Sequence, residues 1–133
     1  MLVLAIVAHT AHRPRPLILT GSSFYWSVQV TVRPGTVRGQ ALIDLVPTYH
    51  GTGTANHMTW RLVDAAGHTV QQGSDNGPVP KGTVLPGQEF LTDSPPPNWD
   101  GTTFDVTWLE IKPTNPGGQG VTEEIPVGPG GAT

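Results

Sequence analysis

The chain has 133 residues, a length that favours one domain, and it contains no cysteine, which excludes disulfide bonds and cysteine-ligated metal. Charged residues make up 13% of the chain, about half of the usual share, so long helices with charged outer faces and an all-helical fold are not expected. The net charge is −3 and the seven basic residues are scattered, so no basic footprint for nucleic acid is present in the sequence.

Residues 1–23 are predicted to form a buried strand and a proline-rich, extended connection. The strand is the apolar run MLVLAIVA, which is far too short to span a membrane and has no positive residues like those that begin an export signal. We expect the strand to dock on another subunit through Leu2, Leu4 and Ile6.

The most regular alternation in the sequence follows this connection. Apolar residues fall on one face, and polar residues and Tyr25 on the other, until the turn at Pro34-Gly35. This pattern predicts a strand with a broad apolar stripe. The stripe consists of Phe24, Trp26, Val28, Val30 and Val32.

Residues 41–72 have the pattern of consecutive antiparallel strands. An apolar run leads to a bend of small residues at 51–56, and a second alternating run ends at a tight turn over 64–67. Pro47 interrupts the first run and predicts a bulge or a sheet edge, because proline cannot donate to a ladder of hydrogen bonds.

The C-terminal half contains two more predicted strands, at 88–92 and 103–111, separated by the proline-rich loop 93–101. Residues 114–133 are rich in Gly and Pro, so we expect an extended arm that is flexible or docked on a partner. Its apolar residues are candidate assembly contacts: Val121, Ile125 and Val127.

These segments predict an all-β fold in which residues 1–113 form a single antiparallel β-sandwich, immunoglobulin-like, with about seven to nine strands. The expected core lies between the two sheets. It comprises Trp26, Val28, Val30, Ile43, Leu45, Met58, Trp60, Leu62, Val70, Phe90, Phe104, Val106 and Trp108.

The runs GTGTAN, HMTWRLVDAAGHTVQQG and VLPGQEF resemble the pattern of bacterial and phage immunoglobulin-like modules of the CARDB-like and fibronectin-III-like kind. The resemblance covers about residues 41–111. It implies a sandwich fold with a binding or spacing role and transfers no catalytic residue.

No residue pattern indicates chemistry. The five histidines lack the spacing of metal ligands, none of the serines lies in a nucleophile motif, and the acidic residues form no convincing pair. We therefore expect no enzyme, no metal and no cofactor.

The loop 93–101 contains the most ambiguous aromatic residue, Trp99, between Asn98 and Asp100. A stiff, amphipathic tryptophan in a loop is suited to stacking on a sugar or to a protein interface. Together with Tyr49, these three residues form the predicted binding surface. The alternative is that Trp99 folds back and covers the end of the sandwich. The same two alternatives, a binding residue or a packing residue, apply to Tyr49.

The leading functional hypothesis is a non-enzymatic structural or interaction module, a small subunit of a bacteriophage virion in the tail or the capsid decoration. The chain starts at Met1 without an export signal, carries little charge and has extended ends. Its expected partners are other structural proteins in a multi-copy assembly, joined through sheet edges and termini.

Two other hypotheses belong to different classes. One is a carbohydrate-binding or adhesion module at the cell surface, with Trp99 in the contact patch. The other is a protease inhibitor that presents the stiff loop 93–101.

Overall fold

The computed structural model describes residues 16–83, 88–93, 95, 96 and 98–129. This part of the chain contains strands and no helix, so the all-β prediction is confirmed. The strands are β1 (Leu17–Ser22), β2 (Trp26–Pro34), β3 (Ala41–Tyr49), β4 (Thr54–Val63), β5 (Thr69–Asp75), β6 (Val79–Pro80), β7 (Gln88–Thr92), β8 (Thr103–Lys112), β9 (Asn115–Pro126) and β10 (Gly128–Pro129).

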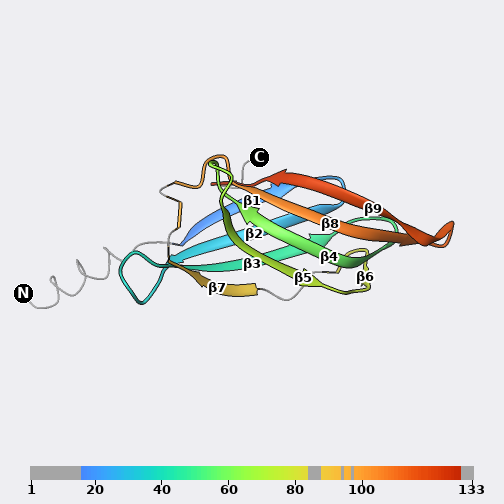
Figure 1. Ribbon diagram of the computed structural model, residues 1–133, viewed down its shortest axis with the longest axis horizontal. Helices are drawn as coiled ribbons and strands as arrows, with labels where there is room; N and C mark the ends of the chain where they lie inside the picture. Colours follow the sequence, from blue (N-terminus) through green and yellow to red (C-terminus); the bar gives the residue numbers. More distant parts are fainter. Residues whose placement is uncertain (1–15, 84–87, 94, 97, 130–133) are drawn as a thin grey trace, which may run out of the picture.

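The strands form two antiparallel sheets that face each other. Sheet I has the order β10-β1-β2-β3-β7, and sheet II has the order β5-β4-β8-β9 with β6 paired to β4. Figure 1 shows β4, β8 and β9 lying across β1, β2 and β3. The predicted antiparallel β-sandwich is therefore confirmed, with ten described strands, two of which contain only two residues.

The core fills the space between the sheets. The predicted core residues are buried, except for Val70 and Phe90, which are partly buried against the cluster. Trp108 is the centre of an aromatic group, with ring centroids 5.2 Å from Tyr25, 5.8 Å from Trp26 and 6.4 Å from Tyr49. Edge-to-face packing of this kind adds to the gain from burial.

Phe24 differs from the prediction, because its side chain is 75% exposed. The Ser23 amide donates to the Trp26 carbonyl at 2.7 Å and closes a turn, so the regular strand begins only at Trp26. A residue within the turn does not follow the alternation of the strand behind it.

Pro47 lies inside β3, opposite Val28, and its side chain is buried. On the other side of β3, the described pairing with β7 covers Ala41 to Leu45, and the Tyr49 backbone bonds to Gly82 and Thr83. The β2–β3 register runs through Pro47 without a shift, so the predicted bulge is not found in this pair. The predicted sheet edge depends on residues that lie outside the described ranges.

The predicted C-terminal arm is largely an integral part of the sandwich. Residues Asn115–Pro126 form β9 along β8, and Gly128–Pro129 form β10 along β1. The difference has a physical reason: Ile125 and Val127 point into the core, and the glycine-rich start allows close packing. At Gly118, which has φ +82°, a Cβ atom would lie 2.7 Å from the Leu109 side chain.

His57 occupies an irregularity in β4 where the strand changes partner from β6 to β5. Its φ is +48°, the left-handed region that disfavours side chains with a branched Cβ. We expect His57→Val to lower the free energy of unfolding by about 1–3 kcal/mol, whereas His57→Gly leaves it within about 1 kcal/mol of the wild type. Urea denaturation of the two variants checks this, and equal stabilities would contradict it.

Candidate functional site

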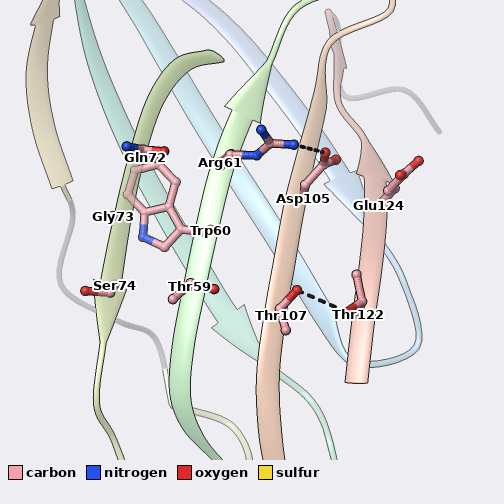
Figure 2. A pocket seen from close by; sticks show the side chains of 10 residues that line it. All are labelled: Thr59, Trp60, Arg61, Gln72, Gly73, Ser74, Asp105, Thr107, Thr122 and Glu124. Carbon is pink, nitrogen blue, oxygen red and sulfur yellow. Dashed lines mark hydrogen bonds and ion pairs between the residues drawn. The ribbon is translucent and has the colours of Figure 1, made fainter. Parts of the chain in front are cut away.

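The outer face of sheet II carries a shallow polar groove of about 680 Å³. Its side chains form two rows that each cross four strands, as Figure 2 shows. One row consists of Ser74, Thr59, Thr107 and Thr122, and the other of Gln72, Arg61, Asp105 and Glu124. Period-two alternation places them here, because the residues between them on β4 and β8 face the core.

The hydroxyl row is neutral and partly organised. The hydroxyls of Thr107 and Thr122 hydrogen-bond to each other at 3.0 Å across β8 and β9. Thr59 lies opposite both Ser74 and Thr107. The row therefore presents a line of small side chains, each of which donates and accepts hydrogen bonds.

The second row carries opposite charges. The Arg61 guanidinium lies 3.8 Å from the Asp105 carboxylate, and the Arg61 side chain is 53% exposed, so this ion pair is loose. Asp105 also accepts a hydrogen bond of 2.8 Å from the Thr103 hydroxyl. Glu124 lies directly opposite Asp105 on β9, which gives the row one positive and two negative side chains.

Gly73 and Trp60 line the groove at its β5 side. A Cβ atom on Gly73 would lie 2.6 Å from the Trp60 indole, so only glycine allows this close approach of β5. Trp60 is 6% exposed and packs on Phe104 with ring centroids 5.9 Å apart. The β5 side of the groove is therefore held in place by the packing of Gly73 on Trp60 and of Trp60 on Phe104.

A second, apolar hollow of about 440 Å³ lies at the β7 edge of sheet I. It lies between the β2–β3 turn and β7, and Leu91 beside it is 52% exposed. The residues that line it are Pro34, Gly35, Thr36, Leu42, Glu89, Phe90 and Leu91.

The predicted Trp99 surface is not formed as a stacking platform. Trp99 is 6% exposed and belongs to the core cluster, while its neighbours Asn98 and Asp100 are exposed. The Asp100 amide donates to the Asn98 side chain at 3.3 Å, and the Thr102 amide donates to the Trp99 carbonyl at 3.3 Å. These turns direct the indole inward, in agreement with the alternative that Trp99 covers the sandwich.

Tyr49 is also buried, with no exposed side-chain surface. Its hydroxyl donates to the Glu110 carboxylate at 2.8 Å, and Glu110 is 4% exposed with Lys112 at 3.5 Å. Burial and the neighbouring carboxylate raise the pKa of Tyr49 well above its ordinary value of 10.0. Tyr49 therefore packs in the core and bonds to Glu110, and it offers no binding surface.

The predicted assembly residues have different positions. Leu2, Leu4 and Ile6 lie outside the described residues. Ile125 and Val127 are buried within their own domain, and Val121 is partly buried against the same core. These three β9 and tail residues are therefore occupied by intramolecular contacts.

Within the described ranges, no group of three or more His, Asp or Glu side chains is arranged to hold a metal ion. Nor does the described part of the chain contain a helix of the length and apolar character needed to cross a bilayer.

No protein-family model, no curated protein and no solved structure matches this chain.

The polar groove was not predicted from the sequence. Each of its residues is recognisable as the outward residue of an alternating strand, for example Arg61 between Trp60 and Leu62. Their side-by-side arrangement depends on the strand order and on β9, which was expected to be an arm.

Proposed function

We propose that this protein is a non-enzymatic interaction module of a larger assembly, a small multi-copy subunit of a bacteriophage virion in the tail or the capsid decoration. It would share the design of the bacterial and phage immunoglobulin-like, CARDB-like and fibronectin-III-like modules. Its partners would be other structural proteins or further copies of this chain.

The β7 edge of sheet I supports this proposal most directly. β7 is a strand of five residues that pairs with β3, and no other described strand pairs with it (Figure 1). An edge strand presents backbone donors and acceptors that another chain can pair with. Short length and charge usually protect such edges, and β7 has both, with five residues and the exposed Glu89. It nevertheless presents an apolar side chain, because Leu91 is 52% exposed.

The apolar hollow beside β7 gives such a partner an anchor. Leu42 and Leu91 face the same side of sheet I, because they are paired across β3 and β7. A partner strand on β7 would bring an apolar side chain over these leucines and remove them from water. Each apolar side chain buried there contributes to assembly, and backbone pairing fixes its direction.

We expect Leu91→Lys to weaken assembly without unfolding the chain, because a lysine on an edge strand opposes pairing. In a lysate that contains the assembled particle, the tagged wild type co-sediments with the particle, and Leu91→Lys lowers the apparent affinity measured by co-sedimentation at least about tenfold, which corresponds to a loss of about 1.4 kcal/mol. Circular dichroism of the purified variants verifies the fold.

Phe24→Lys is the matched control, because it adds the same charge at another exposed apolar residue. Phe24 precedes the start of β2, whereas the part of β3 that carries β7 pairs with the end of β2. It should co-sediment like the wild type. A wild-type chain that remains monomeric in the presence of particles would refute the proposal, as would an equal effect of both substitutions.

A further inference from the structure

We propose that the polar groove on sheet II is a binding site for a neutral, unbranched, β-1,4-linked glycan that lies across the strands. This ligand differs from the assembly partners proposed above, and the site is separate from the β7 edge. It also differs from the Trp99 patch, whose indole is buried.

The spacing of the two rows fits an extended sugar chain. Adjacent strands lie about 4.8 Å apart, so a row over four strands extends about 14 Å, and the rows are about 7 Å apart. The strand spacing is close to the length that one pyranose adds to an extended β-1,4-linked chain. Successive sugar units can therefore meet equivalent side chains on β5, β4, β8 and β9.

The chemistry of the rows fits hydroxyl groups. Each sugar hydroxyl donates and accepts, and the groove offers donors at Arg61, acceptors at Asp105 and Glu124, and both at Gln72 and the hydroxyl row. Among the described residues, only two interactions join lining side chains to each other, the Thr107–Thr122 hydrogen bond and the loose Arg61–Asp105 pair. Most of the donor and acceptor capacity therefore faces the ligand.

The charge of the groove selects against other polymers. Two carboxylates and one guanidinium leave it slightly negative, so anionic glycans and nucleic acids are disfavoured. An extended peptide satisfies its backbone groups along a sheet edge, and the middle of this face offers no backbone groups for it. A neutral glycan avoids both penalties.

The groove is also pre-organised. Its side chains project from four consecutively paired strands, and the β5 side is held by the packing of Gly73 on Trp60. The backbone that carries the lining side chains is therefore fixed before a ligand binds, so no entropy is lost in ordering it. The aromatic lining residue, Trp60, is almost fully buried and offers no ring for stacking. Hydrogen bonds therefore supply most of the binding free energy, and the affinity of a single site is low.

An NMR titration of the isotope-labelled full chain with cellohexaose, a neutral β-1,4-linked glucose oligomer, tests the proposal. We expect saturable shift changes confined to the amides of β4, β5, β8 and β9 around the groove. Hexagalacturonate, an anionic oligomer, should cause changes at least about tenfold weaker. The absence of changes with cellohexaose, changes centred elsewhere, or equal binding of the anionic oligomer would overturn the proposal.

The double substitution Gln72→Ala and Thr107→Val removes one hydrogen-bonding group from each row and should weaken binding at least about tenfold, because two ligand hydrogen bonds are lost. The matched control is Gln29→Ala with Thr31→Val on the outer face of sheet I, which removes the same groups. Retained affinity in the first variant, or equal loss in the control, would refute the site. Because this titration uses the isolated chain, its result is independent of particle assembly.

Discussion

Trp108→Ala is expected to lower the free energy of unfolding by about 3–5 kcal/mol, the range for deleting a large aromatic side chain from a packed core. Trp108 is 1% exposed and contacts three aromatic rings, on Tyr25 just before β2 and on Trp26 and Tyr49 in sheet I. Removing it leaves a cavity between the two layers that these rings cannot fill without leaving their own positions. Urea denaturation followed by far-ultraviolet circular dichroism measures the loss.

Phe24→Ala is the control for that measurement, because it also removes an aromatic ring but at a position that is 75% exposed. We expect a change within about 0.5 kcal/mol, as for ordinary surface substitutions. Similar losses for the two variants would show that Trp108 does not join the sheets in the way described.

Tyr49→Phe is expected to cost about 1.5–3 kcal/mol at neutral pH, the value of a hydrogen bond to a charged partner. The substitution keeps the ring but removes the hydroxyl that donates to Glu110 at 2.8 Å. The Glu110 carboxylate, which is 4% exposed, then retains Lys112 at 3.5 Å as its charged neighbour. Denaturation of Tyr49→Phe and Glu110→Gln, singly and combined, measures their coupling, and strictly additive losses would contradict the interaction.

The same pair predicts a dependence on alkaline pH. The pKa of Tyr49 is raised in the folded state, so above its ordinary value of 10.0 the unfolded chain releases a proton that the folded chain retains. The wild type therefore loses stability as pH rises above about 10, by up to about 1.4 kcal/mol per pH unit from this residue. Tyr49→Phe lacks this loss, so the stability difference between the two proteins should shrink there.

The architecture was predictable from the sequence where strands bury one face and the alternation is unbroken. The residues from Trp26 to Val32 and from Met58 to Leu62 show this, since every second side chain is apolar. The prediction failed at Phe24 because a turn that begins at Ser23 interrupts the alternation. Local hydrogen bonds of this type are not visible in a hydrophobic pattern.

The β9 strand was not predicted from the sequence, for a related reason. Its first half contains Gly117, Gly118 and Gly120, which lowers apparent strand propensity. One of these glycines is required by its neighbour, because a side chain at 118 would collide with Leu109. The requirement arises from packing against β8, and composition alone does not reveal it.

The candidate site was the least predictable part. Trp99 lies in a proline-rich loop with polar neighbours, so its sequence surroundings resemble those of an exposed aromatic residue. Its inward direction depends on the turns at Asn98 and Thr102. The polar groove, in contrast, consists of ordinary outward residues whose alignment requires the register of four strands.

The passage of the chain from β9 to β10 has a mechanical consequence. Pro126 ends a strand of sheet II, Val127 is buried, and Gly128 already pairs with Thr20 in sheet I. One continuous segment therefore belongs to both layers and holds them together along this side. A separation of the layers along this side must therefore expose Val127 and break the pairing of β10 with β1 or of β9 with β8.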